Sequence, residues 1–132
     1  MNFKIDTKEK FTVITPLQFH LSDNLTAELN QTAHNCLQTD IKNVVLNMKE
    51  VVSLDEAAAT NLKSLQQSFY ESNTSFVICE MQPAVSAKLE EMELLEMMNI
   101  TPTESEAWDI VQMEEIEREL LDGDDMEFDK NA

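Results

Sequence analysis

Adjacent carboxylates are the first side chains in this chain that could do chemistry. They occur as Asp55-Glu56, Glu90-Glu91 and Glu114-Glu115. A pair of carboxyl groups can catalyse proton transfer when its surroundings separate the two pKa values. The 132 residues contain 26 Asp and Glu, however, so neighbouring acids are expected by chance. We therefore interpret each pair as solvated charge rather than as a catalytic site.

The thiol and imidazole side chains lack the spacing of a reactive or metal-binding site. Cys36 and Cys79 lie among apolar neighbours, and neither belongs to a Cys-x-x-Cys or Cys/His motif. Such cysteines are usually small buried hydrophobes, so we predict two free thiols and no disulfide. His20 and His34 fall in a loop and a helix without a ligand pattern around them. The sequence therefore predicts no metal site.

Glycine is almost absent, which excludes a large class of enzymes. The only glycine is Gly123. Loops that cradle phosphate groups need glycine for close backbone approach, so a P-loop or Rossmann nucleotide-binding enzyme is excluded. The Gly-x-Ser-x-Gly nucleophile motif is missing as well. We predict a protein that is not an enzyme, with no catalytic residue and no cofactor; the one enzymatic alternative is a metal-binding pocket of carboxylates.

The net charge of −17 limits the kinds of partner. Residues 1–103 carry 14 acids and 7 bases, and residues 104–132 carry 12 acids and 2 bases. Such a field repels phosphate backbones and anionic lipid, so we expect no nucleic-acid binding. No apolar run is long enough to span a bilayer, and the N-terminus lacks the layout of a secretion signal. We expect a cytoplasmic protein without membrane insertion, whose charge serves either a basic protein partner or solubility.

Strands alternate with amphipathic helices along the chain. Alternating residues at 3–5 and 11–13 predict a β-hairpin, and the apolar runs at 44–48 and 76–79 predict buried strands. Helices are expected at about 24–38, at about 56–70, from Pro83 and from Thr103, with Ile100 beginning a short last strand. The order β-β-α-β-α-β-α-(β)-α predicts an α/β layer fold built from crossovers.

The last predicted helix carries two apolar faces. Its start faces the core through Ala107, Trp108 and Val111. A second stripe consists of Ile110, Met113, Ile116 and Leu120. We expect this stripe to pack back on its own domain; the alternative is pairing with another chain. Gly123 is expected to end the helix, followed by a frayed or disordered tail at 124–132.

Residues 43–69 bear most directly on function. A strand at 44–47 and an approach at 51–55 lead into an acidic helix start, where proteins often expose reactive groups. Here that place holds Ala57-Ala58-Ala59. The arrangement resembles a STAS domain, the sulfate-transporter and anti-sigma-factor-antagonist family. Leu62 and Leu65 resemble the leucines behind that family's helix start.

The resemblance extends over residues 3–112. Further similar segments are Phe76-Val77-Ile78-Cys79, Pro83-Ala84-Val85, the cluster Leu94, Met97 and Ile100, and Thr103 to Ala107. Glu93 and Asn73-Thr74 stand where members often have glycine, which indicates a divergent branch. The resemblance implies a STAS-like mixed β-sheet with four amphipathic helices in residues 1–112, and an acidic helical extension and tail in residues 113–132.

In the antagonist branch of the family, a partner kinase phosphorylates a serine at the helix start. Aligning Asp55 with the family's aspartate places Glu56 at the first serine and Ala57 at the phospho-acceptor. Alanine has no hydroxyl, so the switch cannot operate at position 57. A neighbouring hydroxyl, on Ser53 or Thr60, could have taken over that role, but we rank this third. Constitutive partner binding ranks first, and helix packing without signalling content second.

The resemblance implies a non-enzymatic interaction protein, similar to a bacterial anti-sigma factor antagonist in transcription regulation. The partner would be an anti-sigma factor, that is, a serine-kinase-like ATPase. The predicted partner-binding residues are Ser53, Asp55, Glu56, Ala57, Ala58, Asn61 and Lys63. Two alternatives remain: an accessory subunit of a lipid-trafficking ABC transporter that docks on the transporter ATPase, or a structural STAS scaffold without a signalling role. Self-association as a homodimer is a further expectation to test.

Overall fold

A mixed five-stranded sheet forms the centre of the protein. The computed structural model describes residues 2–131, and their side chains up to Leu121. The strand order is β1 (Phe3–Thr7), β2 (Thr12–Pro16), β4 (Val44–Asn47), β6 (Phe76–Cys79) and β7 (Ile100–Thr101). Only β1 is antiparallel to its neighbour, because a short hairpin turn joins it to β2, whereas helical crossovers join the parallel strands. The predicted hairpin and the predicted mixed α/β fold are confirmed.

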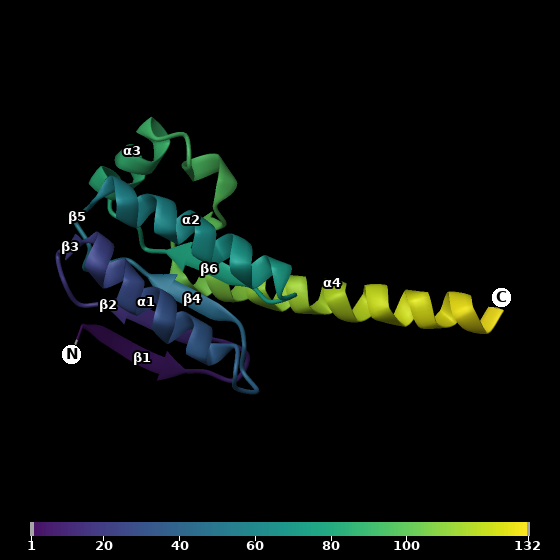
Figure 1. Ribbon diagram of the computed structural model, residues 1–132. Helices are drawn as coiled ribbons and strands as arrows, with labels where there is room; N and C mark the ends of the chain where they lie inside the picture. Colours follow the sequence, from purple (N-terminus) through teal and green to yellow (C-terminus); the bar gives the residue numbers. More distant parts are fainter. Residues whose placement is uncertain (1, 132) are drawn as a thin grey trace.

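Helices cover both faces of this sheet (Figure 1). One face packs against α1 (Asp23–Cys36), α2 (Glu56–Glu71) and α3 (Pro83–Glu91), and the other against the first turns of α4 (Glu104–Asn131). A single 3₁₀ turn, η1 (Leu95–Met97), follows α3. Two further short strands, β3 (His20–Leu21) and β5 (Ser53–Leu54), pair in parallel beside the start of α2. This small pair positions the candidate site.

The two central strands are buried on both faces, as their continuous apolar runs predict. In β4, Val44 and Leu46 face the core under α1 and α2, whereas Val45 faces the smaller core under α4. All three are fully buried. A stripe along α2 at helical spacing is buried as well, consisting of Ala58, Leu62, Leu65 and Phe69. Alternation along β-strands thus divides the apolar residues between two cores.

Helix boundaries follow the predicted signals. Ser22 caps α1, with its side chain accepting a hydrogen bond from the Leu25 backbone, and Pro83 opens α3. The Thr103 hydroxyl accepts from the Glu106 backbone N–H at 3.2 Å, so Thr103 caps the helix that is expected to begin there. Asn73 and Glu93, which stand at positions often held by glycine in the resembling family, have φ values of 62° and 61°. The left-handed backbone is therefore kept there without glycine.

Three predictions about the last helix are wrong. Trp108 does not face the core but is 43% exposed, because it points between the two sides of α4. Of the predicted stripe, Ile110 packs on the core under α4, but the other three residues do not, since Met113 and Ile116 are 55% exposed and Leu120 is 60% exposed. The backbone of α4 continues through Gly123 to Asn131, because one interior glycine costs a helix only about 1 kcal/mol. The predicted tail at 124–132 is thus helical up to Asn131, and Ala132 lies outside the described residues.

Candidate protein-interaction surface

The loop and helix start at residues 53–59 lie at the surface. Ser53, Glu56 and Ala57 are exposed, and Asp55 is half-buried. Between them, Leu54 and Ala58 are buried and anchor the segment to the core. The side chain of Ala58 is therefore unable to contact a partner, although the sequence predicts it as part of the contact surface.

His20 is a central member of this surface that the sequence does not reveal. Its Nδ1 atom lies 2.8 Å from Ser53 Oγ, and its Nε2 atom lies 2.8 Å from Asp55 Oδ1. Because the carboxylate can only accept, Nε2 donates to it, and in the neutral imidazole Nδ1 then accepts from the Ser53 hydroxyl. The partners lie 33 and 35 residues apart in sequence. Only the pairing of β3 with β5 brings them together.

Asp55 links the beginnings of two helices. It stands at the N-cap position of α2, but its side chain caps no α2 backbone group. Its Oδ2 atom instead accepts from the backbone N–H of Asp23 at the start of α1, at 3.2 Å. The hydrogen bond from His20, followed by the bond from Asp23, lowers the pKa of Asp55 below its ordinary value. Asp55 therefore acts as a clamp between α1, β3 and α2.

The order hydroxyl, imidazole, carboxylate is the one that nucleophilic catalysis uses. The side chains of His20 and Asp55 are, however, 50% and 45% exposed. Stabilisation of a charged transition state works in a site from which water is excluded. This arrangement is open to solvent, so we interpret it as a structural clamp that fixes the shape of the surface around Ser53.

The remaining predicted site residues separate into exposed and tethered side chains. Glu56 is paired with Lys88 of α3 at 3.3 Å. Asn61 is half-buried and donates from Nδ2 to Asp23 Oδ1 and Thr26 Oγ1, so it holds α1 against α2. Lys63 is half-buried two residues beyond Asn61 and lines a hollow with Gln66 and Met97. The structure thus brings Ser53, Asp55, Glu56 and Ala57 together and joins Asn61 to the start of α1, whereas Lys63 lies further along α2.

Exposed apolar side chains flank the same loop. Phe19 is 69% exposed and Val52 is 47% exposed. The Phe19 carbonyl accepts from the backbone N–H groups of Val52 and Ser53, at 2.7 and 3.3 Å, so the two apolar residues lie on adjacent backbone segments. Large apolar side chains that gather at the surface of a soluble protein mark interaction sites. No periodic pattern in the sequence distinguishes these two residues from core residues.

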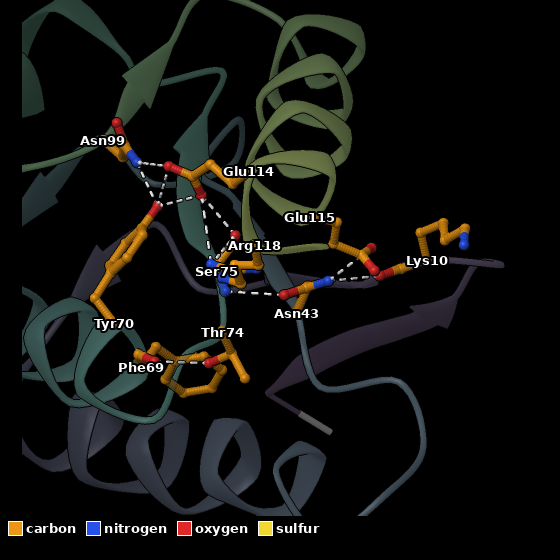
Figure 2. Close-up of polar contacts among 10 residues, drawn as sticks. All are labelled: Lys10, Asn43, Phe69, Tyr70, Thr74, Ser75, Asn99, Glu114, Glu115 and Arg118. Carbon is orange, nitrogen blue, oxygen red and sulfur yellow. Dashed lines mark hydrogen bonds and ion pairs between the residues drawn. The ribbon is translucent and has the colours of Figure 1, made fainter. Parts of the chain in front are cut away.

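A second polar cluster attaches α4 to the sheet (Figure 2). The Glu114 carboxylate accepts from the Tyr70 hydroxyl at 2.8 Å, from the Ser75 hydroxyl at 2.5 Å and from Asn99 Nδ2 at 3.3 Å. Asn99 Nδ2 also donates to the Tyr70 hydroxyl. Arg118 Nη2 donates to Ser75 Oγ at 2.8 Å. Burial, and then the neighbouring Glu114 carboxylate, raises the pKa of Tyr70.

This cluster corrects one prediction about the paired acids. Glu90 and Glu91 are exposed, as predicted, whereas the side chain of Glu114 is only 23% exposed. Its neighbour Glu115 is half-buried and accepts from Asn43 Nδ2 at 3.2 Å. Both face the sheet because α4 crosses polar groups at the ends of β4 and β6. The pair Glu114-Glu115 is therefore structural rather than solvated.

The thiols have the environment of packing residues. Cys79 is fully buried and Cys36 is half-buried, and both are free. Burial, with the nearby Glu104 and Glu80 charges, raises the pKa of Cys79 to about 12, so this thiol stays protonated at neutral pH. Among residues 2–121, no group of three or more His, Cys, Asp and Glu could hold a metal ion. In that same part of the chain, no helix has the length and apolarity needed to cross a membrane.

Comparison with known proteins identifies the fold. Residues 4–107 match the family model of the STAS domain. A putative anti-sigma factor antagonist from Thermotoga maritima superposes with a TM-score of 0.74 at 17% identity, over 83% of this chain and 94% of that chain. The unphosphorylated anti-sigma factor antagonist SpoIIAA gives a TM-score of 0.67 at 15% identity, over 83% and 96%. The murine Slc26a9 anion transporter gives 0.67 at 13% identity, over 82% of this chain and 18% of the transporter. No curated protein sequence matches this chain.

Proposed function

We propose that this chain, which belongs to the STAS domain family, is a non-enzymatic interaction domain and that it binds a protein partner through residues 53–59. The observation that carries the proposal is the exposed apolar pair Phe19 and Val52 beside the exposed Ser53, Glu56 and Ala57. Aromatic residues that become buried at the centre of an interface supply most of its binding energy. A rim of polar groups around them fits the usual anatomy of an interface.

Hydrogen bonds between distant segments hold the loop of this surface. His20 joins β3 to the loop through Ser53 and Asp55, and Asp55 continues to the start of α1. A surface fixed in this way loses little conformational entropy on binding, which favours affinity. The Ala57 methyl group leaves the first turn of α2 flat, so a partner can approach the backbone there. These features support constitutive binding.

We propose further that no phosphate is added at this surface. Ala57 has no hydroxyl, the Ser53 hydroxyl is held by His20, and the Thr60 hydroxyl donates to the Glu56 carbonyl at 3.2 Å. Phosphate would bring about two negative charges next to Glu56 and Asp55, which costs electrostatic energy. Mass spectrometry of the protein isolated from cells should therefore find residues 53–60 unmodified. Phosphate on Ser53 or Thr60 would contradict constitutive binding and restore a switch.

Affinity capture with a matched control tests the contact surface. The tagged chain is immobilised and incubated with native lysate, and captured proteins are quantified for the wild type, Ala57→Arg, Phe19→Ser and Ser105→Arg. Ser105 is exposed on α4, on the opposite face of the sheet, so it serves as the control. We expect at least one protein to be retained by the wild type and by Ser105→Arg and lost with both other variants. Equal capture by all four would show that this surface is not the interface.

The identity of the captured protein also distinguishes an antagonist role from that of an accessory transporter subunit. A histidine-kinase-like ATPase would support an antagonist role. A transporter ATPase would support an accessory transporter subunit, and the occurrence of this fold within a transporter favours keeping that alternative. A binding assay with the purified protein then repeats the Ala57→Arg and Ser105→Arg comparison. Loss of affinity limited to Ala57→Arg is the expected result for either partner.

A further inference from the structure

We propose that the outer face of α4 binds a basic amphipathic helix of a partner protein. This face, which we name the α4 stripe, consists of Met113, Ile116 and Leu120. The three side chains are 55%, 55% and 60% exposed. The helix that carries them extends well beyond the edge of the sheet (Figure 1). The proposal concerns a surface separate from residues 53–59.

The geometry of α4 explains why the stripe cannot reach its own domain. Ala107 and Val111 are fully buried on the sheet, and Glu114 and Arg118 continue the same line with contacts to Ser75. These positions repeat every three or four residues. At roughly 100° of rotation per residue, the stripe lies on the opposite side of the helix. It therefore faces solvent along the whole length over which the inner face is anchored.

The charges beside the stripe identify its occupant. The exposed acids Glu117 and Glu119 lie within the part of α4 that carries the stripe, and the exposed Glu106 and Asp109 lie on the two turns before it. Arg118, the only base from 104 to 121, is 24% exposed and donates inward to Ser75 Oγ at 2.8 Å. The outer face thus combines apolar contacts with uncompensated negative charge. A helix with an apolar stripe and flanking Lys or Arg is complementary to it in both respects.

The same charges disfavour a second copy of this chain as the occupant. Pairing two α4 helices would place Asp109, Glu117 and Glu119 of one copy against acids of the other, and like charges facing each other are destabilising. The apolar area is also small. Three half-exposed side chains expose roughly 300 Å², whereas a stable dimer interface buries about 800 Å² on each partner. Stable binding at the stripe therefore needs attraction between opposite charges in addition to the apolar contacts, which a basic partner supplies and a second copy does not.

A synthetic peptide provides the test with the full-length chain. The probe is a fluorescently labelled 18-residue amphipathic helix of Leu and Lys, compared with a scrambled peptide of the same composition and with a Leu/Glu amphipathic peptide. Binding is measured by fluorescence anisotropy at two salt concentrations. Met113→Gln and Ile116→Gln remove the stripe, and Ile5→Gln on β1 is the control because Ile5 is 54% exposed. Because all three residues are exposed, unchanged thermal melting is expected and is checked for each variant.

The proposal predicts a specific pattern of affinities. The Leu/Lys helix should bind the wild type and Ile5→Gln equally, bind Ile116→Gln about tenfold more weakly, and weaken as salt rises. The scrambled and Leu/Glu peptides should not bind. Equal binding of the scrambled peptide would show unspecific attraction and overturn the proposal, as would unchanged affinity in Ile116→Gln. Dimers in analytical ultracentrifugation that Ile116→Gln abolishes would assign the stripe to a second copy and overturn it as well.

Discussion

Removal of the Glu114 carboxylate tests whether the polar cluster under α4 holds that helix in place. In Glu114→Ala, the hydroxyls of Tyr70 and Ser75 lose their acceptor, whereas Asn99 keeps its bond to the Tyr70 hydroxyl. Without an acceptor, the half-buried Tyr70 hydroxyl costs about 1 kcal/mol, and the fully buried Ser75 hydroxyl, which still accepts from Arg118, costs about 1–1.5 kcal/mol. The lost pair with Arg118, at 3.9 Å and partly exposed, adds about 0.5 kcal/mol at most. We therefore expect the free energy of unfolding to fall by about 2–3 kcal/mol.

Chemical unfolding in urea, followed by circular dichroism, measures this loss. Glu117→Ala is the matched control, because Glu117 is an exposed glutamate on the same helix, and the expected change is within about 0.5 kcal/mol. Glu114→Gln should fall between the wild type and Glu114→Ala, since the amide oxygen still accepts while the amide NH₂ meets donors. If Glu114→Ala were as stable as Glu117→Ala, the cluster would not anchor α4, and our account of why the inner and outer faces of α4 differ would be wrong.

Three further predictions follow from single contacts. Glu93→Gly should raise the free energy of unfolding by about 0.5–1 kcal/mol, because Glu93 has a φ of 61° and glycine adopts this angle more readily. The control Glu90→Gly lies inside α3 and should lower the free energy of unfolding. If both substitutions changed the stability in the same direction in urea, the argument would be refuted. His20→Ala should raise the pKa of Asp55 toward its ordinary value in a carboxyl NMR titration, and an unmoved titration would show that His20 does not hold that carboxylate. Since the pKa of Asp55 is lowered in the folded state, its ionised form stabilises the protein above pH 3.8, and this contribution is lost as the pH falls through the lowered pKa. Leu62→Ala should cost about 3 kcal/mol because Leu62 is fully buried on α2, and a loss below 1 kcal/mol in urea would mean that the core collapses around the deletion.

Local patterns in the sequence were sufficient to predict the fold. The runs at 44–48 and 76–79 are apolar at nearly every position, which is typical of strands buried on both faces. They therefore identify the central strands without tertiary information. Pro83 opens α3 and Asn73 adopts the left-handed conformation because of the intrinsic backbone preferences of proline and asparagine. The buried residues of α2 likewise repeat every three or four positions, which is a pattern visible in the sequence.

The site was less predictable because its contacts join distant segments. His20 gains its role only when β3 pairs with β5, and nothing around it in sequence indicates a partner 33 residues away. The same reason applies to Glu114, whose donors come from α2, from Ser75 just before β6 and from Asn99 just before β7. Trp108 shows the opposite error. Its aromatic side chain predicts a place in the core, but α4 has only one narrow buried face, which Ala107 and Val111 fill.

The division of the helices between the two faces of the sheet makes the molecule two-sided. The start of α2 lies with α1 and α3, whereas α4 lies across the sheet from them. A protein bound at one of the two proposed surfaces would therefore leave the other accessible, and we expect no steric competition between partners at the two surfaces.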